Sequence, residues 1–198
     1  AAIAVAGCYA QVYPAELREI KGVGLIVDNR MKPRIPELLH AGVTGDLPQD
    51  YVKEFEPGTR CDYLPPGRLS GRSRAYLKIQ DGCEARCSYC IVPDSRGPYR
   101  SLGPAQVFQA LERLAQAGYQ EVVLTGIHLG QYGVDLGPTT SLVQLLREMG
   151  RKEFPFRVRL SSLEPNEVVP SLMEMVATEP WLCRHFHIPL QSGDDRIL

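Results

Sequence analysis

The chain has 198 residues, of which 44% are hydrophobic, and its formal net charge is −1. This composition is typical of a folded chain that buries a core, and it excludes an intrinsically disordered protein. No run of eighteen apolar residues occurs in the sequence, so we expect no membrane partner. The opening residues 1–6 lack the basic flank of a signal peptide and predict a buried strand instead.

Strands and helices are expected to alternate over the first part of the chain. Residues 1–6 are small or β-branched and predict a central strand, which ends in a tight turn at 7–10. A helix over about 14–20, a strand over 23–27 and a helix over 36–41 are predicted to follow. This order is typical of an α/β layer with a parallel sheet.

The segment 43–73 is rich in proline and glycine and reads as a linker, which places a domain boundary near residue 70. The sequence therefore predicts one domain over 1–70 and a second over 71–198. Residues 60–100 contain eight basic and four acidic side chains, an excess of 8 − 4 = +4. Charge alone suggests a hypothesis in which phosphate groups contact four arginines, although a solvated linker explains the same excess. These are Arg72, Arg74, Arg96 and Arg100.

From residue 75 onward the pattern predicts four repeated strand–helix units. Such units close into barrels whose active sites lie on the loops after the strands. The fold class expected is therefore α/β, a partial (βα) barrel preceded by part of an α/β domain. The predicted strands are 75–80, 121–125, 156–160 and 185–190, and the helices are 104–117, 141–149 with Ser141 as N-cap, and 165 or 166 to 178.

Three cysteines, Cys83, Cys87 and Cys90, lie within eight residues after the first of these strands. Thiolates are soft ligands that select zinc, copper(I) or iron–sulfur clusters. A structural zinc site is closed by four protein ligands, so three cysteines indicate a metal site with one open position. Two alternatives stay open at this point: unrelated loop thiols, or a non-catalytic metal-binding module closed by a fourth ligand such as His128.

Polar or flexible residues follow each of the other predicted barrel strands. Because these strand ends meet at one rim of a barrel, they predict one composite site. A turn glycine or helix capping would explain some of them equally well. We expect His187 and Cys183 in the core and Cys61 as an incidental linker thiol. The candidate site residues are Gly126, Ser161, Ser162, Glu164, Gln191 and Ser192.

The cysteine spacing C-x3-C-x-aromatic-C resembles the signature of the radical S-adenosylmethionine (SAM) enzymes. The resemblance implies that Cys83, Cys87 and Cys90 hold a [4Fe-4S] cluster, whose fourth iron takes the amino and carboxylate groups of SAM. It implies that Tyr89 lies against the adenine of SAM and that Gly126 meets its amino group. Ser161, Ser162 and Glu164 are expected near its ribose or ammonium, and Gln191 and Ser192 are further cofactor-binding candidates because they lie at the last of these loops.

Longer phrases resemble one branch of that superfamily, the methylthiotransferases. They are AGCYAQ at 6–11, CSYCIVPDSRGPYRS at 87–101, LTGIHLGQYGVDL at 124–136, RLSSLEP at 159–165 and HFHIPLQSGDD at 185–195. The wording of the third and fourth phrases resembles the bacterial tRNA enzymes that methylthiolate C2 of N6-threonylcarbamoyladenosine. Sister branches, which act on isopentenyladenosine in tRNA or on a ribosomal-protein aspartate, stay open as alternatives.

The family resemblance also implies a second [4Fe-4S] cluster on three cysteines of an amino-terminal domain. Cys8 resembles the last of those three ligands, and the other two would precede residue 1. We therefore expect the sequence to be an interior fragment: the carboxyl-terminal part of that domain over 1–70 and the first four βα units over 71–198. The implied partners are the tRNA anticodon loop, SAM, an electron donor and a sulfur source, in the cytoplasm.

Overall fold

The computed structural model describes residues 3–40, 49–55, 61 and 71–197. The chain divides into two compact units. The first comprises Ala1–Asp62 with Gly82–Pro98, and the second comprises Tyr63–Asp81 with Tyr99–Leu198. The predicted boundary near residue 70 falls outside the described residues and stays a prediction. Among the described residues no helix has the length and apolarity to cross a membrane.

The first unit contains a three-stranded parallel sheet in the order β1 (Ile3–Ala6), β2 (Val23–Val27), β3 (Gln49–Tyr51). The strand predicted over residues 1–6 is confirmed for Ile3–Ala6, but its central, buried position is wrong, because β2 lies between the other two strands and β1 is mostly exposed. β3 lies within the segment 43–73 that was predicted to be a linker, so this strand was not expected. The predicted turn at 7–10 is also wrong: α1 (Cys8–Val12) begins directly after Gly7.

Both faces of this sheet are covered by helices. Ile26 of β2 packs with Ala10 of α1 and Leu17 of α2 (Pro14–Arg18), whereas Leu25 and Val27 pack with Leu38 on the other face. Leu38 belongs to α3 (Ile35–His40), which follows the short 3-10 helix η1 (Lys32–Arg34). Because successive strand residues point to opposite faces, β2 is apolar on both sides.

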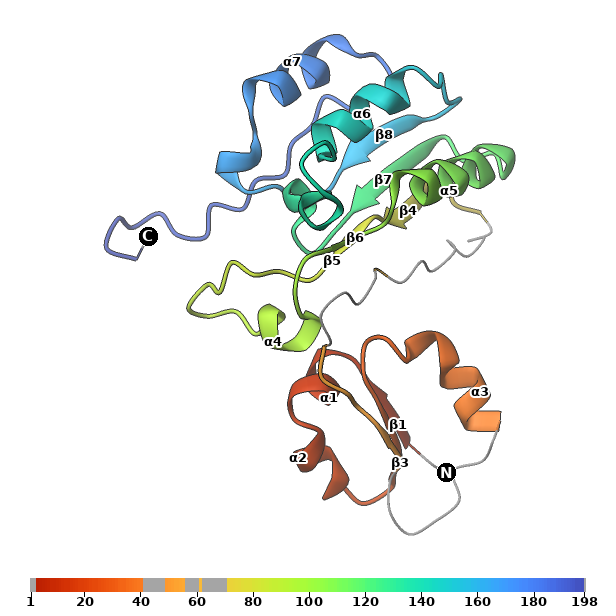
Figure 1. Ribbon diagram of the computed structural model, residues 1–198, viewed down its shortest axis with the longest axis vertical. Coiled ribbons are helices and arrows are strands. Elements are labelled where there is room, and N and C mark those ends of the chain that lie inside the picture. Colours follow the sequence, from red (N-terminus) through yellow and green to blue (C-terminus); the bar gives the residue numbers. More distant parts are fainter. Residues whose placement is uncertain (1–2, 41–48, 56–60, 62–70, 198) are drawn as a thin grey trace. The chain divides into compact units, whose positions relative to one another are not determined.

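The second unit is built on a parallel sheet in the order β4 (Arg74–Lys78), β7 (Glu121–Thr125), β8 (Arg157–Leu160). Ala75, Val122 and Val158 are aligned across the sheet, as are Leu77, Leu124 and Leu160. These six side chains pack in one core with α5 (Pro104–Gln116), α6 (Leu142–Gly150) and α7 (Pro170–Thr178). Figure 1 shows α5 and α6 running along this sheet. Strand–helix repeats with helices along the sheet confirm the mixed α/β class.

The apolar face of α5, predicted from its periodicity, is confirmed by the burial of Val107, Leu111 and Leu114. Ser141 is the N-cap of α6, because its side chain accepts a hydrogen bond from the Gln144 amide at 3.2 Å. The helix predicted from residue 165 is interrupted: η4 (Pro165–Glu167) precedes α7, which begins at Pro170. Proline suits a first helical turn but not a helix interior.

Three short elements and one missing strand depart from the sequence prediction. The antiparallel pair β5 (Gln80–Asp81) and β6 (Arg100–Ser101) was not expected, nor was the helix α4 (Val92–Arg96). The predicted strand over 185–190 is wrong. Within the described part of the chain this segment makes one parallel bridge, between Ser162 and His187, and the neighbouring bridge joins Val158 to Leu182. His187 is exposed rather than a core residue.

A cluster of three arginines surrounds Glu121 at the amino-terminal end of β7. The Glu121 carboxylate, which is 5% exposed, lies 2.7 Å from Arg74 and 2.8 Å from Arg159, with Arg157 at 3.4 Å. The hydrogen bond from Arg159 and the surrounding positive charge hold the pKa of Glu121 below its usual 4.5 against the effect of burial. Residues at this end of a (βα) sheet serve stability rather than chemistry.

Replacing Glu121 with glutamine should lower the free energy of unfolding by about 2 kcal/mol, because charge-assisted hydrogen bonds to Arg159 and Arg74 are lost. The folded-state pKa of Glu121 is depressed, so this contribution is present above the unfolded-state pKa and disappears as the pH falls through the folded-state value. Urea unfolding at pH 7 and in the acid range below 4.5 measures it. The control Glu112→Gln, on the exposed face of α5, should change little. A loss that persists unchanged in acid would contradict this account.

Candidate functional site

The three predicted cluster cysteines lie on the loop between β5 and α4. The base of the loop is closed by a hydrogen bond of 3.0 Å from the Cys83 amide to the Gly97 carbonyl. Gly82 has a φ of 79°, and a Cβ atom built there would lie 1.8 Å from the Pro98 carbonyl oxygen. Only glycine allows this close approach. The two ends of the loop, at Gly82 and Pro98, are therefore held close together.

Within the loop, Cys87 is exposed and Cys83 and Cys90 are half-buried. The Cys90 amide donates to the Cys87 carbonyl at 2.9 Å, which forms a tight turn between these two cysteines. Tyr89 lies on that turn and is 71% exposed. Much of its side chain is therefore accessible to solvent, and its contact with the adenine of SAM stays a prediction.

The structure does not gather the three sulfurs into a preformed metal site. Among the residues that it describes, no three His, Cys, Asp or Glu side chains converge closely enough to hold a metal ion. The donor set nevertheless fits an iron–sulfur cluster. All three side chains are thiols rather than halves of disulfides, they lie on one short loop, and thiolates are the ligands that such clusters take.

A cavity of about 290 Å³ lies against this loop within the first unit. Its walls come from the base of the loop and from Phe55, whose ring also receives the Arg30 guanidinium at 5.0 Å from its centroid. Gly97 leaves room for that ring, since a Cβ atom at this position would lie 2.5 Å from it. The cavity combines an aromatic wall with the charged side chains Glu84 and Arg86.

Cys8 lies at the first position of α1 and is surrounded by donors. Arg96 Nε donates to the Cys8 sulfur at 3.3 Å, and Asn29 Nδ2 lies 3.8 Å from it. Burial raises the pKa of the Cys8 thiol, but hydrogen bonds from Ser95, Arg96 and Asn29 and the Arg96 charge outweigh it, so the pKa lies below its ordinary value. A lowered pKa favours the thiolate, the form that binds metals.

The loop after β7 is held by a hydrogen bond to a buried glutamine, Gln80, which no sequence pattern had indicated. Gln80 is fully buried, and its Oε1 accepts a hydrogen bond of 2.7 Å from the His128 amide. A Cβ atom at Gly126 would lie 2.9 Å from the same oxygen. Gly126 is therefore required for this close packing, and its backbone lies at the carboxyl end of β7, as expected for a ligand-facing edge.

His128 is engaged with Glu167, a second residue that the sequence analysis missed. The two side chains are 2.7 Å apart, and Gln131 Nε2 also donates to Glu167 at 2.9 Å. The hydrogen bond to Glu167 raises the pKa of His128. Although burial opposes it, the bonds from His128 and Gln131 lower the pKa of Glu167. The pair connects the loops after β7 and β8 through Nε2 of His128.

The candidate residues after β8 lie in three different environments. Ser161 Oγ is buried without a hydrogen-bond partner among the described residues. Ser162 Oγ lies 2.7 Å from His187 Nδ1. Glu164 precedes η4, and its amide donates to Glu167 at 2.9 Å. The orphaned Ser161 hydroxyl is the one that a bound polar ligand would satisfy.

Gln191 and Ser192 follow in the irregular segment that replaces the predicted fourth strand. Gln191 is exposed and has a φ of 65°, which is unusual for a residue other than glycine. Ser192 Oγ accepts a hydrogen bond from the Asp194 amide at 3.1 Å, so Ser192 shapes its own turn. The structure places Ser162 beside this segment through His187.

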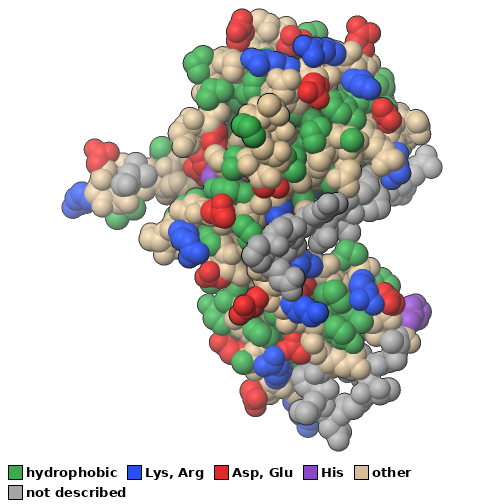
Figure 2. Space-filling view, in the orientation of Figure 1, with side chains coloured by type: hydrophobic (Ala, Val, Ile, Leu, Met, Phe, Trp, Pro, Cys, Tyr) green, Lys and Arg blue, Asp and Glu red, His purple; other side chains and the backbone are tan. Residues whose placement is uncertain are grey.

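Three of the four arginines that the charge distribution suggests as phosphate contacts interact with other side chains of the protein. Arg74 pairs with Glu121, Arg96 donates to Cys8, and Arg100 is buried 3.7 Å from Asp81. On the face drawn in Figure 2, basic and acidic side chains are interspersed over the described residues. The hypothesis that these four arginines contact phosphates stays a prediction.

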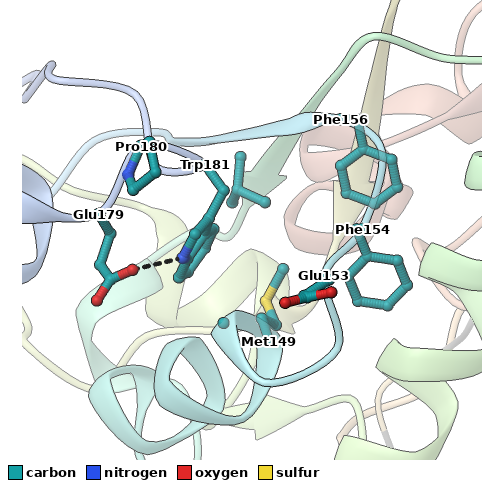
Figure 3. A pocket seen from close by; sticks show the side chains of 9 residues that line it. Met149, Glu153, Phe154, Phe156, Glu179, Pro180 and Trp181 are labelled. Atoms are coloured by element: carbon teal, nitrogen blue, oxygen red, sulfur yellow. Dashed lines mark hydrogen bonds between the residues drawn. The ribbon is translucent and has the colours of Figure 1, made fainter.

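Another cavity, of about 370 Å³, lies at the opposite ends of the strands from the candidate loops. Figure 3 shows Trp181 and Phe156 among its lining side chains, with the indole nitrogen of Trp181 donating to Glu179 at 2.9 Å. Phe154 stacks on Phe156 with 5.1 Å between ring centroids. Its place before β8 makes this cavity part of the packing of the second unit.

Comparison with known proteins identifies the superfamily. The sequence model of the Radical SAM superfamily matches residues 77–198, more than half of the chain. The chain is 36% identical to the threonylcarbamoyladenosine tRNA methylthiotransferase MtaB of Bacillus subtilis, covering 99% of this chain and 44% of that protein. It is 36% identical to the ribosomal protein uS12 methylthiotransferase RimO of Desulforudis audaxviator, covering 97% of this chain and 42% of that protein.

A third relative is the tRNA-2-methylthio-N(6)-dimethylallyladenosine synthase of Pelotomaculum thermopropionicum, with 36% identity over 89% of this chain and 39% of that protein. The chain thus spans less than half the length of these curated relatives. Among solved structures, the radical S-adenosylmethionine methyltransferase TsrM from Kitasatospora setae has a similar fold, with a TM-score of 0.50 and 20% identity over 62% of this chain and 23% of that protein. The superfamily match supports an enzyme with a [4Fe-4S] cluster and SAM as cofactors, and the chain belongs to the Radical SAM superfamily.

Proposed function

We propose that this chain is part of a tRNA methylthiotransferase that adds a methylthio group to C2 of N6-threonylcarbamoyladenosine beside the anticodon. The observation that carries the proposal is the similarity, over nearly the whole chain, to curated enzymes named for that activity. The sequences at the ends of β7 and β8, LTGIHLGQYG from residue 124 and RLSSLEP at 159–165, also resemble this branch of the family. RimO enzymes match this chain at the same identity. Sequence identity therefore supports methylthiotransfer but does not distinguish between the tRNA and the ribosomal-protein substrates.

In this proposal Cys83, Cys87 and Cys90 hold the cluster to which SAM binds. When bound, the cluster and SAM together supply radical chemistry through one-electron reduction of the sulfonium. Tyr89, on the exposed turn, covers the adenine of SAM. The Gly126 backbone, supported by Gln80, receives the amino group of SAM, and the orphaned Ser161 hydroxyl bonds a polar group of the same ligand.

The remaining site residues are assigned less directly. Ser162 and Glu164 follow β8, and Gln191 and Ser192 lie in the segment beside Ser162, where they would complete the SAM and substrate rim. Cys8 would be one ligand of the second [4Fe-4S] cluster, which would supply the sulfur chemistry of the reaction. The proposed partners are the anticodon loop of tRNA, an electron donor and a sulfur source, and tRNA places the reaction in the cytoplasm. A single-stranded loop exposes its bases, so the target adenine can enter such a site.

Mass spectrometry of tRNA nucleosides tests this proposal. The protein that carries this chain is expressed in a bacterium that lacks its own threonylcarbamoyladenosine methylthiotransferase. We expect the methylthio derivative of N6-threonylcarbamoyladenosine to appear, and a Cys87→Ala variant to abolish it. A methylthio group on isopentenyladenosine or on a ribosomal-protein aspartate instead would contradict the proposed substrate. Unmodified tRNA and ribosomal protein would contradict methylthiotransfer itself.

A further inference from the structure

The surroundings of Cys8 come from parts of the first unit that are far apart in the sequence. Asn29 follows β2 by two residues, and Arg96 is the last residue of α4. Asn29 Nδ2 reaches both the Cys8 sulfur, at 3.8 Å, and the Ser95 carbonyl, at 2.9 Å. Arg96 Nε reaches the same sulfur at 3.3 Å. One amide and one guanidinium therefore connect α1, the end of β2 and α4.

The helix that provides Arg96 is the one that follows the cysteine loop. α4 begins two residues after Cys90 and packs against α1. Its carboxyl end is anchored as well, because the Gly97 amide donates to Pro93 and the Gly97 carbonyl accepts from Cys83. Ser95 is completely buried. The base of the cysteine loop and the Cys8 sulfur are thus held by the same five-residue helix.

We propose that Asn29 and Arg96 are positioning residues that connect the Cys8 sulfur to α4, the helix that follows the Cys83–Cys90 loop. Ligand binding to one of these cysteine segments then also restrains the other. The identification of both segments as cluster-binding rests on the proposed function, whereas the connection itself rests on the contacts above. Ordering of the loop by a bound cluster should then also restrain α1.

Hydrogen exchange followed by NMR tests the connection in the metal-free chain. The amides of Gln11 and Tyr13 report on α1, since they donate to Gly7 and Tyr9 at 3.0 and 2.9 Å. Arg96→Gln should raise their exchange rates about tenfold, the loss expected for one hydrogen bond from a charged donor. Arg96→Lys keeps the charge but lacks the Nε–H donor and should behave like Arg96→Gln. The control Arg34→Gln removes an equal charge from the same unit, where Arg34 pairs with Glu37, and should leave α1 unchanged.

A substitution of the acceptor, Cys8, tests the same contacts. Cys8→Ala removes the acceptor sulfur, and it should speed exchange of the Ser95 amide in α4 and of the Gly97 amide that caps this helix. The amides of β2 serve as the internal reference for an intact fold. If α1 and α4 exchange at wild-type rates in all of these variants, the connection does not exist and the inference is overturned.

The same measurement with iron and sulfide loaded onto the chain separates the inference from the proposed function. We expect loading to slow exchange in α1 of the wild type, and to leave α1 unaffected in Arg96→Gln even though its loop is protected. A loaded and protected loop with no change in wild-type α1 would overturn the inference alone. If no cluster forms, the cluster assignment of the loop fails, and the metal-free comparison still decides whether the connection exists.

Discussion

Gly82→Ala should prevent the cysteine loop from closing at its base and should destabilise the protein by about 3 kcal/mol. The added methyl group would lie 1.8 Å from the Pro98 carbonyl oxygen and 2.7 Å from that of Gly97. Backbone atoms cannot rotate away as a flexible side chain can, so the strands leading into and out of the loop must separate. The hydrogen bond from Cys83 to Gly97 would be lost with them.

The matched control for this substitution is Gly118→Ala at the end of α5. Gly118 has the same φ of 79° as Gly82, but nothing lies within 4 Å of the position of its added Cβ. Gly118→Ala therefore measures the cost of the left-handed backbone alone, about 1 kcal/mol. Urea unfolding and iron binding of both variants are compared. An equal loss of stability in the two, with iron binding retained by Gly82→Ala, would show that the base of the loop is not a constraint.

Cys87→Ala should abolish assembly of the cluster, reducing the iron content from about four per chain to near zero. Two thiolates and a vacant third position do not hold a cubane cluster firmly. Cys87 is exposed, so its truncation removes little packing and the unfolding free energy should change by about 0.5 kcal/mol or less. Iron and sulfide analysis after anaerobic reconstitution, with a urea melt, separates lost binding from lost folding.

Cys183→Ala is the control for a thiol outside the proposed site. Cys183 is buried, and its sulfur lies 3.7 Å from Glu121 at the opposite ends of the strands from the candidate loops. This variant should keep the full iron and sulfide content. Retention of iron by Cys87→Ala, or its loss in Cys183→Ala, would contradict the assignment of the three cluster ligands.

The parts of the fold that the sequence predicts well are those whose burial is periodic. β2 and the centre of β7, residues 122–124, are apolar without interruption, and α5 alternates its apolar and polar faces at helical spacing, so their bounds follow closely from the residues. β3, with the sequence QDY, has no such signal, because it is held by pairing with β2 rather than by its own side chains. The pair β5 and β6 is two residues long on each side and is equally invisible to periodicity.

The segment after residue 184 shows the opposite error. His185–Leu190 alternates enough to predict a strand, but it is held at the Ser162–His187 bridge and by no extended ladder among the described residues. A strand depends on a neighbouring strand, and local sequence cannot supply that information. α4 was missed for a related reason, since Pro93 and the short polar segment around it resemble a loop.

For the candidate site, spacing alone identified Cys83, Cys87 and Cys90, and position after a strand identified Gly126 and Ser161. The residues that support them were not predictable in the same way. Gln80 meets the His128 amide across 48 residues, and Asn29 meets Ser95 across 66. Glu167 is buried against His128 only because the loops after two strands converge. Such contacts are set by tertiary packing, and the sequence marks them only as polar residues just beyond a strand.

Electron paramagnetic resonance of the anaerobically reconstituted and reduced chain, recorded with and without SAM, tests the central claim most directly. That claim is that Cys83, Cys87 and Cys90 hold an iron–sulfur cluster with one position open to SAM. We predict about four irons with matching sulfide per chain and a cluster spectrum that changes when SAM is added. A chain that binds zinc without sulfide and shows no response to SAM would contradict the account, because its metal site would then be closed by a fourth protein ligand.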